Sequence, residues 1–147
     1  MRDRAKPEAG AAQFFGSDHR FCDELWAAVE EAAERGDAAA SQVAFAAFDQ
    51  AMRRHFDMEE QVLFPAFEEA TGMTMGPTRV MRAEHDQMRG LLGQMAGADP
   101  GGLLEQGDTL LMLTQQHNVK EEGMLYPMCD ARLGGGWTAI AAALARY

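Results

Sequence analysis

Residues 54–65 read Arg54-His55-Phe56-Asp57-Met58-Glu59-Glu60-Gln61-Val62-Leu63-Phe64-Pro65, and the rest of the chain is arranged around this stretch. The same order of residue types returns, altered, as Gln116-His117-Asn118-Val119-Lys120-Glu121-Glu122-Gly123-Met124-Leu125-Tyr126-Pro127. Both copies contain His, three residues, Glu-Glu, two residues, Leu, an aromatic residue and Pro. A His and a Glu four residues apart are ordinary neighbours on a helix surface. A match that continues to the proline, however, indicates a duplicated unit with the same chemistry in each half.

Length, charge and cysteine content narrow the class of protein. A chain of 147 residues is long enough for one domain with a sizeable core. The net charge of −10 argues against binding to nucleic acid or to anionic membranes, which require a basic surface. The sequence shows no secretory signal and no apolar run near the roughly 20 residues that a membrane-spanning helix needs. Cys22 and Cys129 are too few and too far apart for a disulfide framework, so we expect a cytoplasmic protein.

Four segments of the chain place large residues at alternating steps of three and four, which is the spacing of a helix with one buried face. We call each such row a seam. Because short connections separate the four segments, the sequence predicts an all-α, antiparallel up-down-up-down four-helix bundle. The seams are Phe15, His19, Cys22, Trp26, Val29 and Ala33; Phe45, Phe48, Met52, His55, Glu59, Val62 and Ala66; Met81, His85, Met88, Leu92 and Met95; and Leu103, Gly107, Leu110, Thr114, His117, Glu121, Met124 and Met128.

The ends of the chain and its prolines complete the predicted organisation. Residues 1–12 are expected to form a flexible arm and residues 13–147 the bundle domain. Residues 137–147 are predicted to form a short fifth helix that either caps the bundle or makes a homodimer contact. Pro65 and Pro127 are each expected to bend or end their helix. An early end after Pro65, followed by a long connection, would bring His55 and His85 to the same height.

Six polar residues occupy the apolar seams: His19, His55, Glu59, His85, His117 and Glu121. A buried carboxylate without a partner is costly, so these groups must satisfy one another or share a cation. His19 lies 17 residues before Gly36 and His55 lies 19 after it, which puts the two within about 3 Å of one height in antiparallel helices. His85 and His117 are related in the same way about Pro100.

This arrangement predicts two metal ions in the core of the bundle. Two bridging carboxylates would give each ion two nitrogens and two oxygens from the protein. An oxide or hydroxide bridge would be a fifth ligand and would leave one position open. Imidazole and carboxylate ligands suit iron, manganese or zinc.

At these residues the chain resembles the hemerythrin-like (HHE cation-binding) family, from Phe14 to about Arg132. The resemblance implies a non-haem di-iron centre with two bridging carboxylates inside a four-helix bundle. The oxygen-carrying members have a further histidine where this chain has Arg89. They also place the last acid five residues after its histidine, which here is Glu122. Glu121 is favoured because it lies on the seam and matches Glu59 in the repeat, and Glu122 stays an alternative.

Three functions are compatible with these residues. The first is a binding protein that takes up dioxygen or nitric oxide at the iron pair, for sensing, storage or iron homeostasis. The second is a redox enzyme that turns over peroxide or nitric oxide, or that donates iron for iron–sulfur cluster repair. The third is a storage or structural site for zinc or another metal. Tyr126 and Arg89 are the only candidates for an acid or base outside the ligand set. The binding protein is favoured because nothing in the sequence supplies a substrate pocket.

Overall fold

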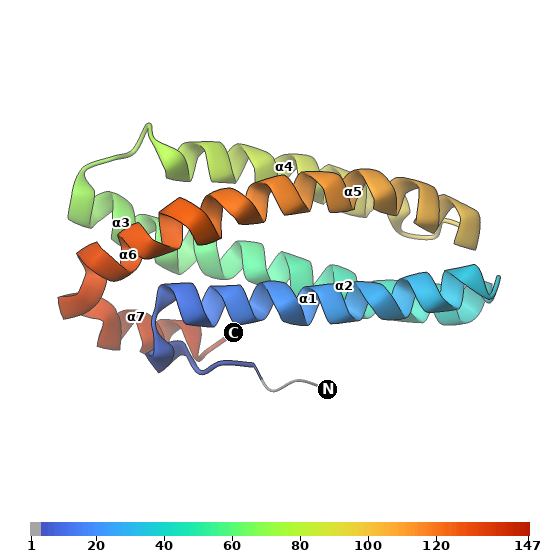
Figure 1. The fold of residues 1–147 in the computed structure, drawn as a ribbon, viewed down its shortest axis with the longest axis horizontal. Helices are drawn as coiled ribbons and strands as arrows, with labels where there is room; N and C mark the ends of the chain where they lie inside the picture. The colour runs from blue at the N-terminus through green and yellow to red at the C-terminus, as the bar shows by residue number, and fades with distance from the viewer. Residues whose placement is uncertain (1–3) are drawn as a thin grey trace.

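The computed structural model describes residues 4–147, which form helices and no β-strand, so the prediction of an all-helical bundle is confirmed for this range. Four long helical segments lie side by side (Figure 1). In chain order they are α1 (Ala11–Glu34); α2 (Ala38–Met58) continued by η2 (Glu59–Leu63) and α3 (Phe64–Thr71); α4 (Pro77–Met95); and α5 (Pro100–Lys120) continued by η3 (Glu121–Leu125) and α6 (Tyr126–Leu133).

Two short connections join these helices in pairs at one end of the bundle (Figure 1). Residues 35–37 link α1 to α2, and residues 96–99 link α4 to α5. The side chain of Asp37 accepts a hydrogen bond from the backbone N–H of Ala40, and Asp99 accepts one from Gly102. These N-caps satisfy backbone donors that the first turn of a helix leaves free. They also set where α2 and α5 begin.

The apolar core consists of two clusters, with the polar seam residues between them. One cluster is built around aromatic residues such as Phe15, Phe64 and Phe67. The other contains Trp26 and Phe48 together with leucines and methionines from all four long segments. A layer of histidine and glutamate side chains therefore lies between two apolar regions that exclude water from both sides.

One turn of π-helix interrupts each copy of the sequence repeat, and the sequence did not predict it. The backbone N–H of Phe64 donates to the carbonyl of Glu59, and that of Tyr126 donates to Glu121, each across five residues. A π turn contains one residue more than an α turn. The next residue in both copies is a proline, which has no N–H to donate. Both helices then continue past their prolines rather than ending there.

The extra residue shifts the buried face by one position. From the end of η2 onward the fully buried residues are Leu63, Phe64 and Phe67, whereas Val62 and Ala66 of the predicted seam are only partly buried. From the end of η3 onward they are Leu125, Tyr126 and Cys129. The prediction that Met124 lies in the core is wrong, because its side chain is 45% exposed. A sequence period of 3.6 residues holds only where the helix is an uninterrupted α-helix.

The predicted early end of the second helix is also wrong. The helix runs to Thr71, and residues 72–76 form the whole connection to α4. In Figure 1 this connection runs back from the end of α3 toward the middle of the bundle. Helix α4 therefore starts nearer the middle than the point where α3 ends. The path of the connection, rather than a shorter helix, therefore brings His55 and His85 to one level.

Short segments cover one end of the bundle. η1 (Pro7–Ala9) precedes α1, and η4 (Gly134–Gly136) leads into α7 (Trp137–Leu144), which lies beside the N-terminal segment (Figure 1). Ile140 and Leu144 of α7 pack into the first apolar cluster. The indole N–H of Trp137 donates to the carbonyl of Pro7 at 2.8 Å. These contacts correspond to a capping role, and a homodimer contact stays a prediction.

Residues 4–12, which belong to the predicted arm, contact the bundle. The guanidinium of Arg4 lies 2.6 Å from the carboxylate of Asp18, and Ala11 N–H donates to Asp130 at 2.7 Å. Helix α1 begins at Ala11, two residues before the predicted domain boundary. Residues 1–3 of the arm lie outside the described part of the chain.

Candidate metal centre

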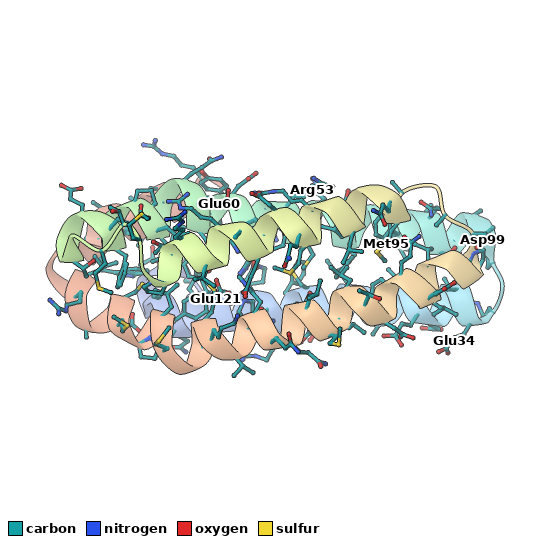
Figure 2. All side chains as sticks on the ribbon, turned by 90° about the horizontal axis from the view of Figure 1, so that it is seen from above. Glu34, Arg53, Glu60, Met95, Asp99 and Glu121 are labelled. Carbon is teal, nitrogen blue, oxygen red and sulfur yellow. The ribbon has the colours of Figure 1, made fainter. Side chains whose placement is uncertain are left out.

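The structure brings all six predicted residues together in two adjoining groups. Each is at most 6% exposed, and Figure 2 places Glu121 well away from the end of the bundle marked by Glu34 and Asp99. Within each group, the donor atoms lie within 4.8 Å of one another. The first group contains Glu59, His85, His117 and Glu121, and the second contains His19, His55 and Glu121.

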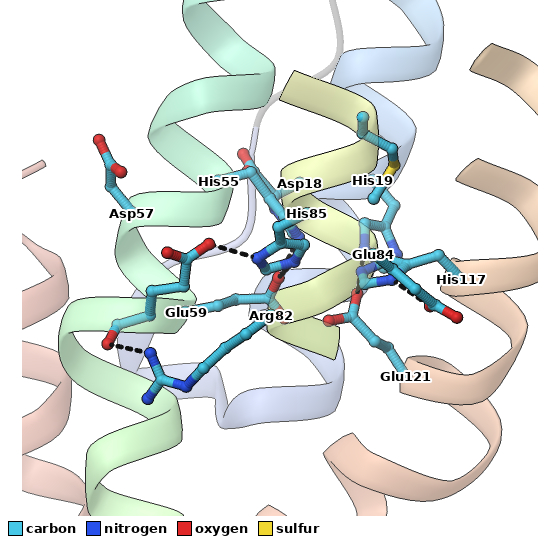
Figure 3. Close-up of polar contacts among 12 residues, drawn as sticks. Asp18, His19, His55, Asp57, Glu59, Arg82, Glu84, His85, His117 and Glu121 are labelled. Carbon is cyan, nitrogen blue, oxygen red and sulfur yellow. Dashed lines mark hydrogen bonds and ion pairs between the residues drawn. The ribbon is translucent and has the colours of Figure 1, made fainter. Parts of the chain in front are cut away.

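Glu121 lies between His19 and His117, and Glu59 lies between His55 and His85 (Figure 3). Glu121 Oε1 is 3.1 Å from Nε2 of both His19 and His117. Glu59 Oε1 is 3.2 Å from Nε2 of both His55 and His85. A carboxylate in this position can contact two ions at once, which is the role expected of a bridging ligand.

Four buried polar atoms in this centre have no hydrogen-bond partner among the described residues: Glu59 Oε1, Glu121 Oε2, His85 Nε2 and His117 Nε2. Buried polar atoms are almost always satisfied, because an unpaired one costs the full loss of its hydration. These four atoms belong to the four residues of the first group. Imidazole nitrogen and carboxylate oxygen are ligands for divalent and trivalent cations. The donor set therefore fits a metal ion.

A carboxylate from another helix orients each histidine ring. In all four cases the Nδ1–H donates to the carboxylate, so Nε2 is the nitrogen that faces the centre. Figure 3 labels two of these carboxylates, Asp18 and Glu84. A histidine that binds a metal is commonly held in this way, because the outer hydrogen bond fixes both the tautomer and the orientation of the ring. The pairs are His55 with Asp18 at 2.8 Å, His85 with Glu60 at 2.6 Å, His117 with Glu84 at 2.8 Å and His19 with Glu122 at 2.9 Å.

Cationic side chains neutralise three of these outer carboxylates. Asp18 pairs with Arg4, and Glu84 pairs with Lys120. Glu60 pairs with Arg89 at 2.8 Å. Arg89, which occupies the position of the further histidine in oxygen carriers, therefore lies outside the centre and acts on His85 through Glu60. Its other partners are Asp57 at 3.3 Å and Asp86 at 3.5 Å.

The orienting role of these outer carboxylates was not predicted from the sequence, although the repeat contains a signal for them. Asp18 and Glu84 each stand directly before a seam histidine, at equivalent positions of the two halves. Glu60 and Glu122 are the second residues of the two Glu-Glu pairs. Of the two alternatives, Glu121 reaches the inner nitrogens and Glu122 binds the outer edge of His19. Glu121 as the carboxylate ligand of the fourth helix stays a prediction.

Burial and charge act against each other in the metal-free centre. Burial favours the neutral forms, but the attraction between His55 and Glu59 outweighs it. The pKa of His55 is therefore raised well above its usual value, and the pKa of Glu59 is held well below its own. Burial and the neighbouring Glu121 and Glu59 raise the pKa of the Tyr126 phenol well above its usual value. A metal ion would supply the positive charge that these carboxylates attract.

A small apolar cavity adjoins the centre. Three of the four buried histidines, His19, His55 and His117, form part of its wall. The cavity has a volume of about 20 Å³, counted as the space that the centre of a water molecule can occupy. This is enough for one water or one diatomic molecule. The remaining wall is largely apolar and includes Trp26, Phe48, Met52, Met88 and Leu110. The cavity is thus suited to a small, weakly polar molecule beside the histidines.

Comparison with known proteins agrees with this geometry. A sequence model of the hemerythrin HHE cation-binding domain matches residues 11–134, so the chain belongs to the hemerythrin HHE family. The family match and the buried histidine–glutamate cluster together indicate a metal-binding domain. Searches of curated proteins and of solved structures found no match. Within residues 4–147, every helix is too short or too polar to cross a membrane.

Proposed function

We propose that the protein binds two iron ions in this centre and takes up dioxygen or nitric oxide there, for sensing, storage or iron homeostasis. The observation that carries this proposal is the group of four buried nitrogen and oxygen atoms on Glu59, His85, His117 and Glu121 that make no hydrogen bond with the described residues. His19 and His55 would hold the second ion, and Glu59 and Glu121 would bridge the two. Ferrous iron binds both dioxygen and nitric oxide, which is the chemistry that such a pair would supply.

The residues around the centre support binding of a small molecule. The four outer carboxylates hold the rings with Nε2 inward, so the ligand atoms are organised before any ion arrives. The cavity excludes molecules larger than a few atoms and, because its wall is largely apolar, keeps bulk water away from the histidines. A larger organic substrate would have no space beside the centre.

The enzyme alternative has less support from the surroundings of the centre. Arg89 is engaged by Glu60 and Asp57, and its guanidinium lies 5.3 Å from the centre of the Phe56 ring. Tyr126 is the remaining acid–base candidate of the two that the sequence suggested. General acid–base chemistry needs a group within hydrogen-bond reach of the reacting atom. Tyr126 meets this condition and Arg89 does not, and we favour reversible binding over turnover because the cavity beside the histidines is small and largely apolar.

Metal analysis combined with ligand binding tests the proposal. We expect protein from iron-replete cells to contain two irons per chain, and His117→Ala to lose them. The reduced protein should bind nitric oxide or dioxygen reversibly, as followed by its optical spectrum. Zinc at full occupancy would support the storage or structural alternative instead. Rapid, irreversible oxidation without reversible binding would contradict the proposed uptake of dioxygen.

A cytoplasmic location and a homodimer are further parts of the proposal. Cell fractionation and light scattering of the purified protein test them. A monomer at every concentration would remove the homodimer and leave the metal centre unaffected.

A further inference from the structure

The hydroxyl oxygen of Tyr126 lies inside the group formed by His19 and His55. It is 2.8 Å from both Glu59 Oε2 and Glu121 Oε1. It is also 3.2 Å from His19 Nε2 and 3.4 Å from His55 Nε2. A phenol has one proton to donate, although its oxygen can also accept hydrogen bonds from the two imidazoles. A carboxylate oxygen can only accept, so one proton cannot serve both the contact with Glu59 and the contact with Glu121 at 2.8 Å.

These distances match the spacing of neighbouring ligands on one ion. Ligand bonds to nitrogen and oxygen are about 2.0–2.2 Å long, so two ligands at right angles are roughly 3 Å apart. All four contacts of the Tyr126 oxygen lie between 2.8 and 3.4 Å. The oxygen thus has the position of a fifth protein ligand beside His19, His55, Glu59 and Glu121.

The other half of the repeat lacks this oxygen. The residue equivalent to Tyr126 is Phe64, which follows Leu63 and precedes Pro65 just as Tyr126 follows Leu125 and precedes Pro127. Phe64 is fully buried, and its ring lies 5.7 Å from that of His85, at an angle of 18°. An aromatic ring without a hydroxyl therefore satisfies the packing at this position. The hydroxyl is an addition to one side of the centre only.

We infer that Tyr126 is a further ligand, as phenolate, of the ion held by His19 and His55, which makes the two metal positions inequivalent. This inference rests on the proposed metal centre. On binding, the phenol O–H bond breaks and its proton passes to solvent, while an oxygen electron pair forms the bond to the ion. The ion between His85 and His117 faces Phe64 and has one protein ligand fewer.

Optical and resonance Raman spectra of the iron-loaded, air-oxidised protein test the inference. A phenolate bound to ferric iron gives a charge-transfer band in the visible range and enhances the ring vibrations of the tyrosine. We expect the wild-type protein to show both signals, and Tyr126→Phe to lose them completely while it retains two irons per chain. Tyr147→Phe is the matched control, because the chain has two tyrosines and Tyr147 is an exposed residue at the C-terminus. Its spectrum should equal that of the wild type.

A gain-of-signal variant gives a second test that does not depend on removing a residue. Phe64→Tyr offers a phenol to the other ion and should strengthen or shift the band. A wild-type protein with two irons and no phenolate signal would overturn the inference and leave the metal centre standing. So would a Tyr126→Phe spectrum identical to that of the wild type. Wild-type protein that retains no iron on metal analysis would overturn the centre and this inference together.

Discussion

The carboxylate of Glu122 lies 2.9 Å from Nδ1 of His19, on the opposite edge of the imidazole from the metal centre. Glu121, the preceding residue, lies 3.1 Å from Nε2 of the same ring. Two consecutive glutamates therefore contact the inner and the outer nitrogen of one histidine. Glu60 and Glu59 make the corresponding contacts with His85. The duplicated Glu-Glu pair thus provides one inner oxygen donor and one orienting carboxylate in each half.

Substitutions at the two glutamates should have different effects on metal binding. We expect Glu121→Ala to lose stoichiometric metal, because Glu121 belongs to both donor groups. Glu122→Ala should keep both ions with an affinity reduced about 10- to 100-fold, as is usual for an outer partner. Metal content after gel filtration and competition with a chelator measure the two effects. If Glu122→Ala lost both ions and Glu121→Ala kept them, the assignment would be reversed.

Gly107 makes room for the indole of Trp26, which lines the cavity beside the centre. A Cβ atom at this position would lie 2.2 Å from Cζ2 of Trp26. We expect Gly107→Ala to reduce the free energy of unfolding by about 1–3 kcal/mol, the usual cost of overpacking a core. Gly90 in α4 is the matched control, since a Cβ there would meet no described atom within 4 Å. Gly90→Ala should raise stability by about 0.5–1 kcal/mol. Urea denaturation compares the two, and equal effects would contradict the contact with Trp26.

Filling the cavity should slow ligand binding without changing the metal ions. Leu110 lines the cavity, and its side chain is almost fully buried. We expect Leu110→Phe to reduce the rate of nitric oxide binding to the reduced, iron-loaded protein. An added barrier of about 1.4 kcal/mol would give a tenfold reduction. Leu113→Phe, on the same helix but outside the cavity wall, is the control for stopped-flow measurements. A normal rate in Leu110→Phe with an intact metal spectrum would show that ligands reach the iron by another route.

The two thiols should be unreactive in the folded protein. Burial raises the pKa of Cys129 to about 12, and burial also raises the pKa of Cys22. Only the thiolate reacts with thiol reagents. The labelling rate of an ordinary thiol rises steeply between about pH 7 and 9, because its pKa is about 8.5. Here the rate should stay low over that range, and both thiols should react only in denaturant. Fast labelling of either cysteine in the native protein would show that its helix opens locally.

Uninterrupted α-helices were the most predictable part of the fold. Every residue of the seams in α1 and α4 is buried, as the three-and-four spacing indicated. In the other two helices the prediction fails after Glu59 and after Glu121, where a π turn changes the phase by one residue. Two hydrogen-bonding patterns compete at these positions. The period of 3.6 residues in the sequence assumes α-helical hydrogen bonds, whereas the packing of the complete bundle favours the π-helical ones.

Repeat spacing and helical rise are properties of the chain alone, so the sequence was enough to place six polar residues on the buried faces of an all-helical bundle, with His19 level with His55 and His85 level with His117. The folded structure was needed to show that the two pairs share one level and which atoms meet. Asp18 and Glu84 reach histidines on neighbouring helices, and the Tyr126 hydroxyl enters the centre although its repeat partner is a phenylalanine. Such contacts depend on the rotation of each helix about its axis. That rotation is set by the packing of all four long segments and by the extra residue in each π turn.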